Sequence, residues 1–90
     1  MSVLPAIRCI SVRVLLFAQL KDRVGADELR VSLPRGSTGQ DLMRWLAHHH
    51  PKAQGVLAVS RLAVNCEYAS RDHVFQEHDE IVIIPPVSGG

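Results

Sequence analysis

Two glycines, Gly89 and Gly90, close the 90-residue sequence after an apolar run and a pair of prolines. Glycine carries no Cβ, so such a segment can enter a slot too narrow for any side chain. Pro85 and Pro86 fix φ near its extended value and donate no N–H, so we expect them to end sheet pairing and direct the tail outward. At roughly 3.3 Å per extended residue, the six residues after Ile84 reach on the order of 20 Å. The expected chemistry is therefore that of the Gly90 carboxylate inside a slot of another protein.

A simpler interpretation of this end is a frayed terminus, since termini are often disordered and rich in glycine. Two glycines can also be an engineered scar. A scar would not follow a buried-strand pattern and a proline pair directly, without a linker. We favour a functional tail, and a binding domain with an inert tail is the alternative that the sequence leaves open.

The side chains that could do chemistry form no recognisable catalytic pattern. His48, His49 and His50 are consecutive, and consecutive helical residues point about 100° apart, so they do not converge on one metal ion. His73 and His78 have no second ligand at a suitable spacing. The sequence contains no nucleophile paired with a base, no phosphate-binding loop and no paired carboxylates. We therefore predict no metal site, no bound cofactor and no catalytic side chain, which strengthens the case for the terminal carboxylate.

Length and charge restrict the class of protein. Ninety residues form one domain that buries about 60 to 65% of its extended-chain surface, which leaves room for one modest core. Ten basic and nine acidic residues give a formal net charge of +1, so we expect no nucleic-acid and no membrane partner. Cys9 and Cys66 lie far apart, outside any metal or redox spacing, as suits a reducing compartment.

The first twenty residues combine Arg8, Arg13 and an apolar run, which makes a signal or transit peptide conceivable. Against it, arginines interrupt the apolar stretch, no small-residue cleavage site follows, and cleavage would remove the best strand of the sequence. No stretch approaches the 18 or more apolar residues of a membrane span. We expect a cytoplasmic protein.

The first third of the sequence predicts two strands. Residues 11–18 are rich in Val, Leu and Phe. One face of this strand carries Val12, Val14 and Leu16, and the other carries Arg13, Leu15 and Phe17. Residues 19–24 can form one or two helical turns before Gly25, a typical helix stop. Residues 28–33 alternate polar and apolar residues and end at the turn 34–36, which predicts a second strand paired with the first as a hairpin.

The main helix is expected to begin at Ser37 or Thr38, with Gln40 or Asp41 completing a capping box. It must end near Pro51, because proline disfavours a helical conformation of the preceding residue. Its apolar stripe consists of Leu42, Met43, Leu46 and Ala47, flanked by Trp45.

Residues 52–60 are ambiguous, whereas 61–65, 67–74 and 80–84 predict a strand, a short strand with a turn, and a last, most buried strand. One long helix on a mixed sheet, with the first and last strands adjacent at its centre, is the ubiquitin-like β-grasp fold of the α+β class. The predicted organisation is an amino-terminal extension (1–11), a β-grasp domain (12–84) and a carboxyl-terminal tail (85–90).

Apolar residues are also expected on the sheet face that the helix leaves uncovered, because a two-layer fold covers only one face. Core packing is the default for Leu15, Phe17, Val82 and Ile84. We nevertheless predict that Phe17 and Ile84 lie on the uncovered face, with Tyr68 nearby, as a docking patch for a partner.

With these residues identified, residues 12–90 resemble the small subunit of molybdopterin synthase, the MoaD-like sulfur carriers. Two groups of segments carry the resemblance: 14–20 with 24–25 following, and 63–65 leading to 79–81 and the closing Pro-Pro-Val-Ser-Gly-Gly of 85–90. The closing motif is highly specific, whereas residues 36–60 are generic.

The resemblance implies that an E1-like enzyme adenylates Gly90 with ATP, and that sulfur then replaces the adenylate to give a thiocarboxylate. Gly90 would donate this sulfur, and Gly89 would let the tail enter the large subunit of a heterotetrameric synthase. There, two sulfurs convert cyclic pyranopterin monophosphate to molybdopterin in molybdenum cofactor biosynthesis. The partner-binding residues would be Phe17, Tyr68, Ile84, Pro85, Pro86 and Val87.

The sequence departs from the family pattern at His78, where relatives usually carry glycine at a turn position that requires positive φ, and at Cys66, where they carry a polar residue. These departures bear on the subfamily and leave the tail untouched. The alternatives are a related sulfur carrier for thiazole or cysteine synthesis, of which the residues before Gly89 disfavour the thiazole carrier, and a ubiquitin-like modifier that joins Gly90 to lysines of target proteins.

Overall fold

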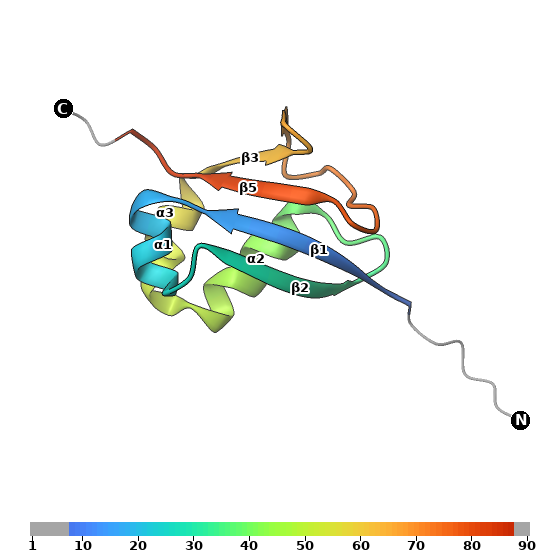
Figure 1. Ribbon diagram of the computed structural model, residues 1–90, viewed down its shortest axis with the longest axis horizontal. Helices are drawn as coiled ribbons and strands as arrows, with labels where there is room; N and C mark the ends of the chain where they lie inside the picture. The colour runs from blue at the N-terminus through green and yellow to red at the C-terminus, as the bar shows by residue number, and fades with distance from the viewer. Residues whose placement is uncertain (1–7, 88–90) are drawn as a thin grey trace, which may run out of the picture.

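The computed structural model describes residues 8–87 (Figure 1). Its elements, in chain order, are β1 (Cys9–Leu16), α1 (Ala18–Val24), β2 (Glu28–Pro34), α2 (Gly39–His49), the 3-10 helix η1 (Pro51–Ala53), α3 (Gln54–Ala58), β3 (Arg61–Val64), β4 (Glu67–Ala69) and β5 (Glu80–Ile84). The strands form one sheet in the order β2-β1-β5-β3-β4. β1 and β5 are parallel at its centre, and the other pairs are antiparallel. The predicted ubiquitin-like β-grasp fold is confirmed.

The first strand is displaced from its predicted bounds. β1 begins at Cys9, which pairs with Pro34 of β2, so it includes residues expected in the amino-terminal extension. It ends at Leu16 because Phe17 instead caps α1, where its carbonyl accepts from Leu20 N at 3.1 Å. The apolar run continues past this point, and composition alone therefore does not reveal the end of the strand.

The first helix, α1, begins one residue before the predicted stretch 19–24 and has the predicted stop. Gly25 closes it with φ of 86°, and its N–H donates to Lys21 O at 2.8 Å. Positive φ is readily adopted by glycine, which explains the residue type at this position.

The main helix, α2, begins with the predicted capping box. Thr38 N donates to Asp41 Oδ2 at 2.9 Å, and Asp41 N donates to Thr38 Oγ1 at 3.3 Å. The alternative pair is not used: Ser37 Oγ donates to Pro34 O, and Gln40 accepts from Arg71. α2 ends at His49, two residues before Pro51, as predicted.

The ambiguous stretch 52–60 contains η1 and the five-residue helix α3. Arg71 holds the end of α3, because its Nη2 donates to the carbonyls of Leu57 at 2.9 Å and Ser60 at 3.1 Å. Among residues 8–87, no helix is long and apolar enough to cross a membrane.

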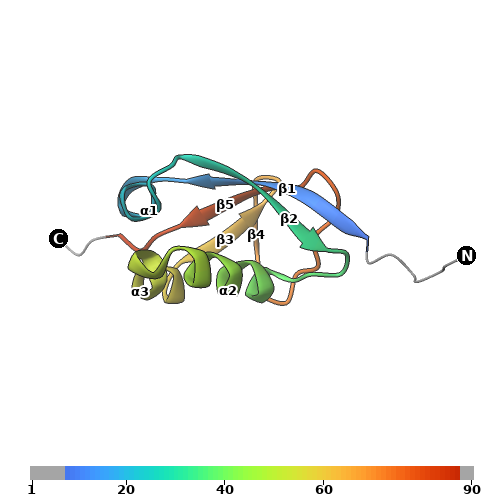
Figure 2. The same ribbon diagram turned by 90° about the horizontal axis from the view of Figure 1, so that it is seen from below.

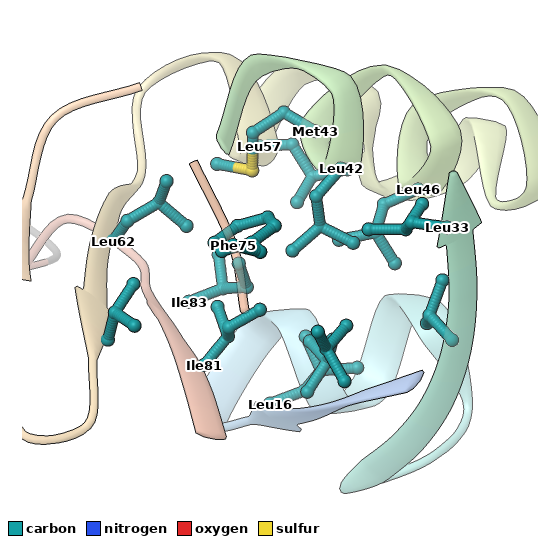
Figure 3. Packing of buried hydrophobic residues seen from close by; sticks show 14 of the residues in the cluster. Leu16, Leu33, Leu42, Met43, Leu46, Leu57, Leu62, Phe75, Ile81 and Ile83 are labelled. Carbon is teal, nitrogen blue, oxygen red and sulfur yellow. The ribbon is translucent and has the colours of Figure 1, made fainter. Parts of the chain in front are cut away.

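One hydrophobic core lies between the sheet and the helices α2 and α3 (Figures 2 and 3). Ile81 and Ile83 of β5 point into it beside Phe75, which is 2% exposed. From α2 the core receives Leu42, Met43 and Leu46, as the predicted stripe requires, and Ala47 and Trp45 pack at its margin.

Two turns adopt positive φ at residues other than glycine. Asn65 and Cys66 join β3 to β4 with φ of 50° and 72°, the combination of a type I′ hairpin turn. His78 precedes β5 with φ of 67°, so the expected positive φ is confirmed. Asp79, which is buried, accepts from Asn65 Nδ2 at 2.8 Å and from Gln76 N at 2.8 Å, and this links the two turns.

Candidate functional site

The face of the sheet opposite α2 and α3 carries a group of apolar residues. Ile81 and Ile83 are buried against the helices, so the alternating Val82 and Ile84 point to the other face, where they are half-buried. Figure 2 shows the helices α2 and α3 on the same side of the sheet. We call the opposite side the open face.

Strand register determines which residues share the open face, because directly paired residues point to the same side. Val82 pairs with Leu15 of β1 and with Ala63 of β3, and Ala63 pairs with Tyr68 of β4. Phe17 keeps the extended conformation of β1, with φ of −128° and ψ of 160°, and continues the alternation from Leu15. The open-face patch consists of Leu15, Phe17, Ala63, Tyr68, Val82 and Ile84.

The patch exposes large apolar side chains. Phe17 is 53% and Tyr68 is 70% exposed, whereas the other members are buried or half-buried. Phe17, Tyr68 and Ile84 therefore share the open face as the sequence predicts, and Leu15, Ala63 and Val82 join them. Sequence reasoning left core packing as the default for Leu15 and Val82, although alternation places them beside Phe17 and Ile84. It missed Ala63, whose place depends on the pairing of β3 with β5. The role of the patch in binding a partner stays a prediction.

The predicted tail begins directly beside this patch. Pro85 follows Ile84 and is half-buried, while Pro86 and Val87 are exposed. These three residues and the first turn of α1, Ala18 and Gln19, line a hollow of about 420 Å³. Figure 1 shows the end of β5 on the same side of the molecule as α1 and α3. Gly89 and Gly90, the predicted sulfur-carrying end, lie outside the described residues.

The other half of the open face is charged and internally neutralised. Arg13 Nε lies 3.0 Å from Glu28 Oε2, and Arg13 Nη1 lies 3.1 Å from Glu80 Oε2. The hydrogen bond from Arg13 holds the pKa of Glu28 below its ordinary value, and the same bond raises the pKa of Arg13. A protein that covers this half meets an ion network whose charges already compensate one another. Sequence reasoning predicted a partly solvent-exposed face at Arg13. It missed the ion-pair partners of Arg13, Glu28 and Glu80, which come from two other strands.

A second arginine lies at the edge of the patch. Arg61 pairs with Ile84 in the sheet, and its guanidinium carbon lies 5.0 Å from the centre of the Tyr68 ring. This distance is within the range of a cation–π interaction. Sequence reasoning missed the contact because Arg61 and Tyr68 meet diagonally across β3 and β4.

One histidine of the run 48–50, His49, packs on the main helix. The His49 ring stacks on Trp45 with a centroid distance of 4.1 Å, and His49 Nδ1 lies 2.9 Å from Trp45 O. Within residues 8–87, no group of three or more His, Cys, Asp or Glu side chains is arranged to hold a metal ion. Cys9 and Cys66 are free and exposed.

Comparison with known sequences matches residues 14–90 to the ThiS family. The molybdopterin synthase sulfur carrier subunit of Dictyostelium discoideum is 48% identical to this chain over 81 residues. That alignment covers 87% of this chain and 94% of the relative.

Two solved structures share the fold. SAMP1, small archaeal modifier protein 1, from Haloferax volcanii has a TM-score of 0.78 at 28% identity, and the match covers 89% of this chain and 99% of that chain. The putative molybdopterin converting factor, subunit 1, from Pyrococcus furiosus has a TM-score of 0.78 at 29% identity, and the match covers 87% of this chain and 99% of that chain.

Proposed function

This chain belongs to the ThiS family, and on that premise we propose that it is the sulfur carrier subunit of a molybdopterin synthase. The observation that carries the proposal is the exposed open-face patch directly beside the start of the tail at Pro85. A carrier needs a surface that binds its partner and a reactive end that enters it. The name of the Dictyostelium relative, a sulfur carrier subunit, supports the same assignment.

The carboxyl group of Gly90 is the proposed site of sulfur attachment. A carboxylate is a poor electrophile, so an E1-like enzyme first joins it to AMP from ATP, with release of pyrophosphate. A sulfur nucleophile then attacks the acyl carbon of the mixed anhydride, and AMP leaves because it is a good leaving group. The product is a thiocarboxylate, a soft anionic nucleophile, and the chain itself binds no cofactor in this scheme.

The large subunit of the synthase is the proposed partner of the open-face patch. Covering Phe17, Tyr68 and Ile84 removes apolar surface from water, which supplies binding free energy. The bare Gly89 and Gly90 then enter the active site of that subunit, where the sulfur is transferred to cyclic pyranopterin monophosphate. We place this reaction in the cytoplasm, a reducing compartment that suits the free thiols of Cys9 and Cys66.

A second candidate function is protein modification, favoured by the similarity to SAMP1. In this function the activated Gly90 forms amide bonds with lysines on many target proteins. Broad lysine conjugates after activation would distinguish a modifier from a carrier that binds one stoichiometric partner.

The proposal is tested by deleting Gly90 and by the substitution Gly89→Val. Deletion abolishes sulfur transfer in a reconstituted synthase assay, and the melting temperature stays that of the wild-type protein. Valine at position 89 blocks the slot and disfavours conformations open to glycine, so it reduces adenylation or sulfur delivery. Pyrophosphate release reports adenylation, and a chemically thiocarboxylated variant reports delivery. Wild-type activity of both variants would exclude a threaded tail and favour an inert one.

A further inference from the structure

Arg61 differs from Arg13, another arginine of the open face, in how its charge is compensated. Arg13 contacts two carboxylates at 3.0 and 3.1 Å. Among residues 8–87, no carboxylate lies within ion-pair distance of Arg61, and its guanidinium instead contacts the exposed ring of Tyr68. Arg61 thus brings an uncompensated positive charge to the edge of the apolar patch, directly opposite the last residue of β5.

A positively charged hollow adjoins this arginine at the β4 edge of the sheet. It has a volume of about 440 Å³, and its lining includes Arg61, Arg71, Tyr68 and the two serines Ser60 and Ser70, without any carboxylate. The carbonyl oxygens at the end of α3 fix Arg71 in the lining, because its Nη2 donates to three of them. The hollow therefore offers an approaching anion the guanidinium of Arg61 and the positive charge of Arg71, whereas the Ser60 hydroxyl already donates to Val56 O at 2.6 Å.

Docking of a protein on the open-face patch removes water from Arg61. A guanidinium that loses water without gaining an acceptor carries a large desolvation penalty. Stacking on an aromatic ring leaves the N–H edges of the guanidinium free, and these edges match the two oxygens of a carboxylate. The patch alone suits any apolar surface, whereas the arginine restricts the partner to one with an acidic side chain at the matching position.

We propose that Arg61, held by Tyr68 beside the charged hollow, receives a carboxylate side chain of the protein that covers the open-face patch. The inference rests on the proposed function, in which that protein is the synthase large subunit. It goes further by assigning a charge-selective contact to a surface that is otherwise apolar.

The test compares Arg61→Gln with Arg13→Gln in calorimetric titrations against the large subunit of the same synthase. Loss of a charge-assisted hydrogen bond is expected to weaken binding roughly 10-fold or more for Arg61→Gln. Arg13→Gln is expected to change the affinity less than about 3-fold, because its charge is compensated within the chain. Arg61→Lys keeps the charge without the two-pronged geometry, so its affinity should lie between those of wild type and Arg61→Gln. Thermal melts of each variant check that the fold is retained.

Two further measurements identify the carboxylate. The difference between wild type and Arg61→Gln should shrink as salt concentration rises, because exposed ionic contacts are screened. Arg61→Glu should abolish binding, and replacing one acidic residue of the large subunit by arginine should restore it. Failure of every such replacement to restore binding would overturn the inference.

The outcomes separate the inference from the proposed function. If Arg61→Gln binds within about 2-fold of wild type while Ile84→Asp does not bind, the docking patch stands and the carboxylate contact is wrong. If the wild-type protein itself does not bind the large subunit, the proposed function fails and the inference fails with it.

Discussion

The two faces of β5 carry the same kind of side chain and have different surroundings. Ile81 and Ile83 are fully buried against the helices, whereas Val82 and Ile84 are half-buried on the open face. A strand that is apolar on both sides ordinarily indicates burial on both sides. Here the helices cover one face of the sheet, so within residues 8–87 the second apolar face lies open. One face of a strand thus stabilises the fold, and the other is available for binding.

The largest expected effect comes from making the same isoleucine-to-aspartate change at two neighbouring residues of β5, one on each face. Ile83→Asp places a carboxylate in the core and should lower the free energy of unfolding by roughly 4 kcal/mol or more. Ile84→Asp should retain the fold and lose affinity for the large subunit, because it charges the patch. Urea unfolding and calorimetric titration of both variants measure the two effects. A large loss of stability by Ile84→Asp with normal affinity would show that the open face is core.

The two phenylalanines of the chain provide a matched second comparison. Phe75 is 2% exposed and Phe17 is 53% exposed. Phe75→Ala should lower the free energy of unfolding by about 3 to 5 kcal/mol, since it leaves a cavity in the core. Phe17→Ala should change it by less than about 1 kcal/mol and should weaken binding of the large subunit. Equal destabilisation by both variants in urea unfolding would contradict the assignment of Phe17 to a docking surface.

A smaller effect is expected from weakening the helix that covers the inner face. Thr38→Ala removes the hydroxyl that accepts from Asp41 N, and should lower the free energy of unfolding by about 1 kcal/mol. The open-face patch is unchanged by this substitution, so affinity for the large subunit at a temperature where the variant is folded should equal that of wild type. Reduced affinity at full folding would show that the two faces are coupled.

The smallest effect appears in the pH dependence of stability. The backbone N–H and then the hydroxyl of Thr38 hold the pKa of Asp41 below its ordinary value. This carboxylate therefore stabilises the fold above its unfolded pKa of about 3.9, and the contribution disappears as pH falls through the lower folded pKa. Asp41→Asn should lose less stability than wild type between about pH 5 and pH 2 in urea unfolding, because it lacks this titrating carboxylate. Parallel acid limbs for wild type and Asp41→Asn would contradict this role.

The sequence predicts those parts of the fold that depend on local patterns. The capping pair Thr38 and Asp41 lies three residues apart, so it is visible in the sequence and is found in the structure. The bounds of β5 are also predicted correctly, because they follow from a continuous apolar run. The end of β1 is not, since Phe17 suits a strand by composition and acts as a helix cap in the fold.

Residues of the candidate site could be predicted from the sequence only where alternation along a single strand determines which face a side chain occupies. Phe17 and Ile84 could be assigned to the open face because successive side chains of an extended segment point to opposite faces and a two-layer fold covers only one of them. The ion network of Arg13 and the contact of Arg61 with Tyr68 each join residues of different strands. Such contacts depend on sheet register, which the hydrophobic pattern restricts but does not specify between strands.

The most direct test of sulfur carriage is the intact mass of the protein after incubation with its activating enzyme, ATP and a sulfur source. The account predicts a mass increase equal to the replacement of one oxygen by sulfur, located at Gly90 by fragmentation and absent from the variant without Gly90. An unchanged mass, under conditions in which the same enzyme activates a known carrier, would contradict the account. Amide conjugates on many lysines in place of the thiocarboxylate would favour the modifier instead.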